Sequence, residues 1–141
     1  MPPISSLEVR RDISAVLSSL IVVIYLLASC SQSASETFTA AERVAADSVV
    51  RSIGNRDSLA TLQKQWEREG NTLESIVALR VMGDALRNES AFDEALTVHS
   101  EGLRQAEAIQ DTLEWVQALN NVGTDYRRMG ILDIAQEYHY Q

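Results

Sequence analysis

The chain has 141 residues, with 12 basic and 20 acidic side chains and a formal net charge of −8 at pH 7. This length allows one or at most two small domains. A single cysteine excludes an intrachain disulfide framework and a cysteine-rich zinc site. The acidic balance argues against direct nucleic-acid binding, which needs clustered Lys and Arg. We therefore expect neither a metal nor another cofactor, and no nucleic-acid partner for this segment.

Residues 1–29 are predicted to be a signal peptide or a membrane anchor. Arg10 and Arg11 precede an apolar run over residues 13–28. The run has about the length of a signal-peptide core and is short for a transmembrane helix of about 20 residues. It ends in Leu-Ala-Ser before Cys30, which resembles the lipobox of bacterial lipoproteins. That resemblance implies cleavage before Cys30, lipidation of its sulfur and attachment to a membrane of the bacterial cell envelope.

Two alternatives stay open for this N-terminal segment: an uncleaved single-pass membrane anchor, and a buried helix of a soluble protein. Glu8 and Asp12 favour them, because both dilute the positive charge before the apolar run. Residues 30–39 are rich in Ser and Thr and have no apolar period, which predicts a flexible tether. Thr37 and Thr39 are candidate caps for the helix that follows.

From residue 40 onward the chain contains no proline, and apolar residues recur at spacings of three and four, which predicts helices alone. Residues 40–70 are predicted to form a helix pair whose members stop at Gly54 and Gly70. The apolar face expected on the first of these helices consists of Ala41, Val44, Ala45, Ser48, Val49 and Ile53. On the second helix the expected face contains Leu59, Leu62 and Trp66.

The chain repeats itself at a shift of 40 residues, which divides it into copies over residues 71–110 and 111–141. The Thr-Leu-Glu segment at 72 recurs unchanged at 112. Asn71 and Asp111 precede these segments, and the Glu three positions later predicts a capping-box start for each copy. Further matched pairs are Ala78 with Ala118, Gly83 with Gly123, Arg87 with Arg127, Ala95 with Ala135 and His99 with His139.

The repeated pattern resembles the tetratricopeptide repeat family, and the chain is similar to tetratricopeptide proteins of the Bacteroidetes type. Its motif is filled by Leu79, Met82, Gly83, Leu86, Ser90, Phe92 and Ala95, and again by Leu119, Val122, Gly123, Tyr126, Gly130, Leu132 and Ala135. The resemblance implies an all-α solenoid of antiparallel helix hairpins, here with a 40-residue period rather than the usual value of about 34. Residues 40–70 are then a degenerate repeat or a cap.

The resemblance also implies a role for the small residues of the motif. Gly83 and Gly123 are expected where the first helix of each copy crosses its partner, because a side chain there would push the backbones apart. Ala95 and Ala135 serve the same purpose from the second helix. Ser90 and Gly130 are expected to form the turn between the two helices.

The second copy ends inside its second helix, at Gln141. Helical arrays generally need about three repeats and a polar cap for stability. The sequence is therefore expected to be the N-terminal part of a longer protein.

In tetratricopeptide arrays the first helix of each repeat lines a concave groove. The resemblance places seven side chains of this chain there: Arg80, Asp84, Arg87, Asn120, Asn121, Thr124 and Arg127. Arg binds a carboxylate through a two-pronged contact, and Asn bonds an extended backbone at both donor and acceptor. The expected partner is a protein or a peptide.

Catalysis is not expected, since no glycine-rich phosphate loop and no Ser-His-Asp order is present. His99 and His139 are interpreted as packing residues rather than as a metal pair. The preferred functional hypothesis is a membrane-anchored, non-catalytic module that binds a protein or peptide. The alternative is the N-terminal sensor part of a signal-transduction or transcription regulator whose output domain lies beyond residue 141.

Overall fold

A computed structural model describes residues 38–141 of this chain. The predictions for residues 1–29, for Cys30 and for nearly all of the tether lie outside the described residues. The described residues, 38–141, belong to one compact unit. Its helices are α2 (Ala40–Ser52), α3 (Arg56–Glu69), α4 (Thr72–Asn88), α5 (Phe92–Ile109), α6 (Thr112–Arg128) and α7 (Leu132–His139).

The described part of the chain is all-helical, which confirms the predicted all-α class. The absence of proline and the apolar spacing of three and four residues account for this result. Between residues 38 and 141, no helix combines the length and apolar character needed to cross a membrane.

The ends of α2 and α3 follow the local signals. The Thr39 hydroxyl accepts a hydrogen bond from the Glu42 backbone N–H, and the Glu42 carboxylate accepts one from the Thr39 N–H at 2.6 Å. This reciprocal pair is a capping box. Asn55 caps α3 by accepting from the Ser58 N–H, and Gly70 ends it at φ +79°, a conformation that suits glycine. Of the two threonines predicted as candidate caps, Thr39 is the one that caps α2.

The two copies begin differently, although their sequences match. The Asn71 side chain forms no capping hydrogen bond at α4; its amide donates to Glu69 instead. The capping box predicted there is wrong. Asp111 does cap α6, accepting from the N–H groups of Leu113 and Glu114. The Glu114 carboxylate accepts a hydrogen bond from Arg43 of α2.

The helix boundaries keep the 40-residue period. Helices α4 and α6 begin and end at equivalent positions, and α5 and α7 begin at equivalent positions. Ser90 (φ +66°) and Gly130 (φ +82°) both take the left-handed conformation in the turn that follows, which confirms the predicted interhelical turns.

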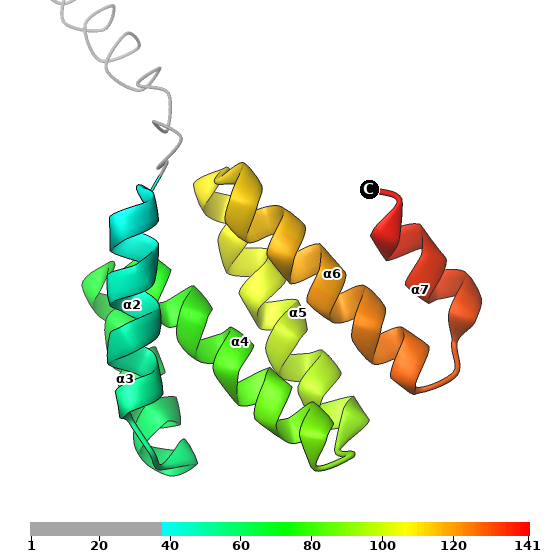
Figure 1. Cartoon of the computed structure of the whole chain (residues 1–141), viewed down its shortest axis with the longest axis horizontal. Coiled ribbons are helices and arrows are strands. Elements are labelled where there is room, and N and C mark those ends of the chain that lie inside the picture. Colours follow the sequence, from blue (N-terminus) through cyan, green and yellow to red (C-terminus); the bar gives the residue numbers. More distant parts are fainter. Residues whose placement is uncertain (1–37) are drawn as a thin grey trace, which may run out of the picture. The chain divides into compact units, whose positions relative to one another are not determined.

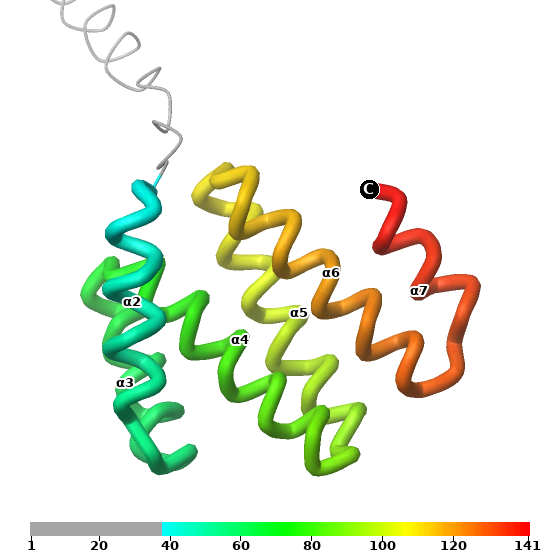
Figure 2. The backbone as a smooth tube through the Cα atoms, viewed as in Figure 1, coloured from blue at the N-terminus to red at the C-terminus, as the bar shows by residue number. Residues whose placement is uncertain are grey.

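Each helix from α3 to α7 packs on the next one, and α2 packs on α4. The chain reverses direction at each turn between α4 and α7, so that neighbouring helices run antiparallel (Figures 1 and 2). A smaller contact joins α4 directly to α6. The first helix of one copy therefore touches the first helix of the other.

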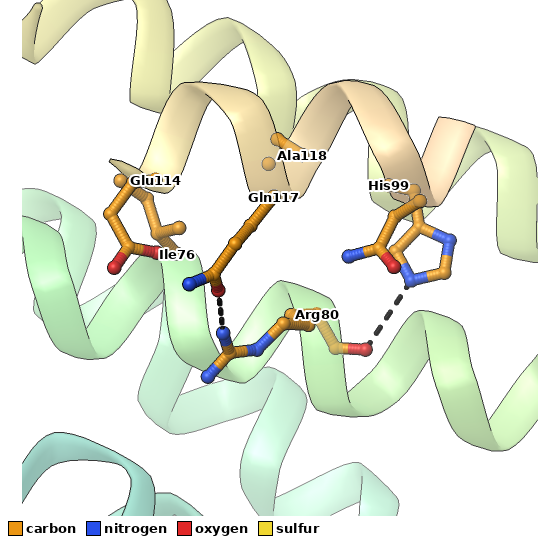
Figure 3. A pocket seen from close by; sticks show the side chains of 8 residues that line it. Ile76, Arg80, His99, Glu114, Gln117 and Ala118 are labelled. Carbon is orange, nitrogen blue, oxygen red and sulfur yellow. Dashed lines mark hydrogen bonds between the residues drawn. The ribbon is translucent and has the colours of Figure 1, made fainter. Parts of the chain in front are cut away.

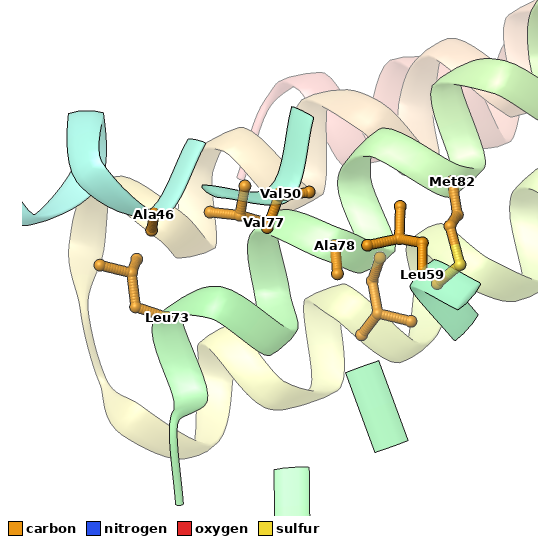
Figure 4. Close-up of a cluster of buried hydrophobic side chains, with 8 residues drawn as sticks. Ala46, Val50, Leu59, Leu73, Val77, Ala78 and Met82 are labelled. Atoms are coloured by element: carbon orange, nitrogen blue, oxygen red, sulfur yellow. The ribbon is translucent and has the colours of Figure 1, made fainter. Parts of the chain in front are cut away.

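Two apolar clusters hold the helices together. The larger joins α2, α3 and α4 (Figure 4) and contains Ala46, Val50, Leu59, Leu73, Val77, Ala78, Leu79 and Met82. The smaller joins α4, α5 and α6 through Ile76, Ala106 and Ala118. Leu59 of α3 is buried and Trp66 packs against the larger cluster, in agreement with the face expected for that helix.

Helix α2 buries a different face from the one expected. Val44 is 70% exposed and Val49 is 50% exposed, whereas Ala46 and Val50 are buried. The predicted inward face of α2 is therefore wrong except at Ile53, which packs against the larger cluster. The reason lies in two charged residues, since Arg43 and Asp47 form ion pairs with α6 and α4 and so orient the helix.

Candidate functional site

Three arginines tie helices α2, α4 and α6 to one another. Arg43 of α2 is the first. Its guanidinium pairs with Asp111 at 2.7 Å and with Glu114, and both carboxylate side chains are 2% exposed. The backbone N–H of Phe38 also donates to Asp111, and the Phe38 ring lies 5.8 Å below the Arg43 guanidinium carbon. Arg43 therefore neutralises two acids that have lost most of their water.

Arg80 of α4 is the second tie. Its guanidinium donates to the side-chain oxygen of Gln117 on α6 and pairs with Asp47 of α2 at 3.2 Å. Figure 3 shows the hydrogen bond from Arg80 to Gln117. It also shows the contact between the backbone carbonyl of Arg80 and His99. A small cavity beside Arg80 has a volume of about 10 Å³, which is enough for one water molecule.

Arg87 of α4 is the third tie, and it belongs to a buried cluster of charge. Its guanidinium pairs with Asp84 and lies 3.4 Å from Oδ1 of Asp125. The other oxygen of Asp125 is 2.5 Å from Nδ1 of His99. Asp125 and His99 are almost fully buried, and Nε2 of His99 lies 3.3 Å from the Arg80 carbonyl oxygen. The cluster connects α4, α5 and α6.

His99 also explains the glycine at position 83. A Cβ on Gly83 would overlap the imidazole ring of His99. The obstacle to a side chain at position 83 is thus the His99 ring rather than the opposing backbone. A Cβ on Gly123 would lie 2.9 Å from the His139 ring in the same way. The Gly-His contact is thus repeated in both copies.

The alanines of the motif are buried. Ala95 has no exposed surface, and Ala135 is 3% exposed. His99 is a packing residue with two polar partners, in line with its interpretation from sequence. His139 is exposed, which differs from that interpretation. No group of three or more potential metal ligands lies together among residues 38–141.

The structure brings together only some of the predicted groove residues. Arg87 contacts both Asp84 and Asn121, and its guanidinium lies 3.5 Å from the Asn121 oxygen. Arg80 lies about one turn before Asp84 on α4. Its side chain contacts Asp47 of α2 and Gln117 of α6 instead. The remaining three residues, Asn120, Thr124 and Arg127, lie on α6, where Asn120 and Arg127 are exposed.

Two acids of this surface have a lowered pKa. Burial raises the pKa of Asp111, but hydrogen bonds from the Glu114 N–H, from Arg43 and from the Phe38 N–H outweigh it, and the pKa falls below its ordinary value of 3.8. The hydrogen bond from Arg51 lowers the pKa of Asp47, with a further contribution from Arg80. Both acids are therefore held in the charged form that the arginines bind.

Sequence reasoning missed Arg43, Asp47, Gln117 and Asp125, which supply the ties. Their partners lie far away in the sequence, as with Arg43 and Glu114, which are 71 residues apart. One signal was available, because position 125 carries Asp where the first copy has Ala85. A charged residue at a motif position that is apolar in the other copy indicates a polar partner.

A comparison of the chain with protein-family models, curated proteins and solved structures gives no match.

Proposed function

We propose that this chain is a membrane-anchored, non-catalytic protein-interaction module built from tetratricopeptide-like helix hairpins. The observation that carries the proposal is the 40-residue register of α4 and α6 together with their direct contact. Helices repeated in this way present equivalent side chains side by side, and such surfaces bind extended or helical segments of partners.

The chemistry of the polar surface also supports binding rather than catalysis. Arg43, Arg80 and Arg87 are each occupied by side chains of this chain. The only buried histidine of the described part has a carboxylate and a carbonyl as partners and lies beside a cavity of one-water size. A general base needs access to the proton that it removes, and His99 lacks that access here.

The exposed part of the predicted groove, at Asn120 and Arg127, is where we place the partner. A photo-crosslinking amino acid at Asn120 of the full chain should give a discrete adduct with one protein partner. The same amino acid at Lys64, exposed on α3, serves as the matched control. Equal labelling at both positions contradicts the proposal. Arg87 is unsuitable for this test, because its substitution disturbs the buried cluster.

Membrane attachment rests on Cys30 and is a separate part of the proposal. The thiol follows Leu-Ala-Ser, and several acyl chains would hold the protein where a single chain binds only marginally. Labelled palmitate should enter the wild-type protein in a bacterial host and be lost from Cys30→Ser. Unchanged membrane association of an unlabelled protein would favour the uncleaved anchor instead.

A further inference from the structure

Helix α2 packs on α4 in the way that a bound helical segment packs on a groove. Although α3 follows α2 closely in the sequence, α2 packs on α4 rather than on α3. Its buried side chains are Ala46 and Val50. In Figure 4, Ala46 points toward Leu73 of α4. Val50 points toward Val77, and both valines are at most 1% exposed, so water is excluded from this contact.

Two charged side chains of α2 complete the contact. Arg43 pairs with Asp111 at 2.7 Å and with Glu114, and both acids belong to α6. Asp47 pairs with Arg80 of α4 at 3.2 Å. Together with the two buried apolar residues, Arg43 and Asp47 fill positions i, i+3, i+4 and i+7 of one helical stripe. This is the anchor spacing of amphipathic helices that bind in grooves.

Arg80 connects this contact to the predicted groove. The repeat resemblance places Arg80 there, together with Asp84 one turn later. Arg80 also donates to Gln117 of α6. Asn120, where we place the partner, lies one turn beyond Gln117 on the same helix. Helix α2 therefore covers the part of the predicted groove that adjoins the partner position.

Helices α3 to α7 are joined by contacts that do not involve α2. Gln63 of α3 donates to Ser75 of α4 at 3.0 Å, and the Ser75 hydroxyl donates to Gln105 of α5 at 2.7 Å. The smaller apolar cluster and the contact between His99 and Asp125 connect α4, α5 and α6. These contacts persist when α2 leaves, so α2 can detach while the other helices stay packed.

The charges of the contact have partners when α2 is detached. Asp47 keeps its ion pair with Arg51 of the same helix at 2.7 Å. The two acids that pair with Arg43 are solvated together with it, so no charge stays buried without a partner. After α2, Gly54 is exposed, and a Cβ on it would meet no atom within 4 Å. The turn that follows α2 therefore has room to move.

We propose that α2 is a strap that covers part of the predicted groove and leaves it when a partner binds. The inference rests on the proposed function of the chain as an interaction module, and it adds the regulation of that surface. The strap detaches as a unit by turning near Gly54. Its departure uncovers Leu73, Val77 and Arg80, and so extends the surface at Asn120 along α4.

Val50→Asp tests the strap, with Val49→Asp as the matched control. Val50 has no exposed surface, whereas Val49 is 50% exposed on the same helix. A carboxylate at position 50 is buried only while the strap is closed, so it favours the open form. In the full chain in detergent micelles, residues 40–52 should exchange their amide hydrogens at least about tenfold faster in Val50→Asp than in wild type. Residues 72–128 should keep the wild-type exchange, as should both segments in Val49→Asp.

A fluorescent peptide of residues 38–53 provides a second measurement. It should bind the full chain that carries Val50→Asp, whose own strap is open, and should bind neither the wild type nor Val49→Asp. A peptide with Arg43→Gln should bind about tenfold more weakly, as expected for the loss of one charge-assisted hydrogen bond. A peptide with Arg51→Gln should bind like the unmodified peptide, because Arg51 is exposed.

Three outcomes would overturn the proposal. Equal acceleration of exchange in residues 40–52 and 72–128 of Val50→Asp would make α2 part of the common core. Equal exchange of residues 40–52 in Val50→Asp and Val49→Asp would show that the buried stripe does not hold the strap. Failure of the peptide to bind Val50→Asp would show that nothing can take the place of α2.

The cross-link at Asn120 separates this proposal from the proposed function. Its yield should rise in Val50→Asp and stay unchanged in Val49→Asp. An unchanged yield in Val50→Asp would overturn regulation by the strap and leave the proposed function standing. Absence of a cross-link from every chain would remove the proposed function, whereas hydrogen exchange and peptide binding would still decide whether the strap opens.

Discussion

Nδ1 of His99 lies 2.5 Å from Oδ2 of Asp125, and the two side chains are at most 1% exposed. The two residues belong to α5 and α6, so this contact joins the first copy of the repeat to the second. Asp125 has no equivalent in the first copy, where the position is Ala85. A periodic fold has thus gained a specific polar contact at one boundary.

Removal of the Asp125 carboxylate should strongly destabilise the protein. Asp125→Ala leaves His99 and Arg87 buried without their shared partner, which costs about 3 kcal/mol or more. Urea unfolding followed by circular dichroism measures the change. Asp133→Ala, at an exposed site of α7, should stay within about 0.5 kcal/mol of wild type. A loss below about 1 kcal/mol for Asp125→Ala would show that the contact contributes little.

The two glycines of the motif should respond differently to alanine. The new methyl of Gly83→Ala meets the buried His99 ring, and overpacking costs about 1–3 kcal/mol beyond the helix-propensity gain of about 1 kcal/mol. Gly123→Ala faces His139, whose exposed ring has room to move, and should be near neutral. Thermal unfolding of both variants tests this. Equal midpoints would contradict the difference in freedom between the two rings.

Arg43 should matter more than an arginine in an exposed ion pair. Arg43→Met leaves Asp111 and Glu114, each 2% exposed, without their cation, and the expected loss is about 3 kcal/mol. Arg56→Met breaks the exposed pair with Glu89 and should cost less than about 1 kcal/mol. Denaturant titration of both variants at one pH gives the comparison. Similar losses would mean that burial of the acids does not decide the effect.

Asp111 should contribute a pH dependence to stability on the acid side. Its pKa in the folded protein is lower than its ordinary value of 3.8, so the folded state holds the charged form more strongly than the unfolded state. The resulting stability is complete above the ordinary pKa and is lost as the pH falls through the lowered one. Asp111→Asn should give a shallower decline of unfolding free energy below pH ~4. Parallel declines for both proteins would contradict the assignment.

Local sequence determined most of the helices. Thr39, Asn55 and Gly70 placed the ends of α2 and α3, since caps and left-handed turns depend on residues only a few positions apart. The 40-residue comparison likewise placed the turns at Ser90 and Gly130. Spacing alone failed at Asn71, where a suitable side chain found a different partner in Glu69.

The candidate site was less predictable than the fold. Helical spacing predicts which side chains share a face of a helix. It does not predict which side chains of other helices contact that face. Arg80 and Arg87 were expected to point at a partner, yet both are bound by this chain's own Gln117 and Asp125. The exposed positions are Asn120 and Arg127 of the second copy.

The sequence by itself determined the helical class, the 40-residue register and the need for glycine where helices of a copy meet. Only the tertiary structure decided which face α2 buries and which arginines are occupied. The physical reason is range. Capping and apolar periodicity act within one or two turns of helix, whereas Arg43 reaches acids 68 and 71 residues away, and such pairs exist only after the helices have packed.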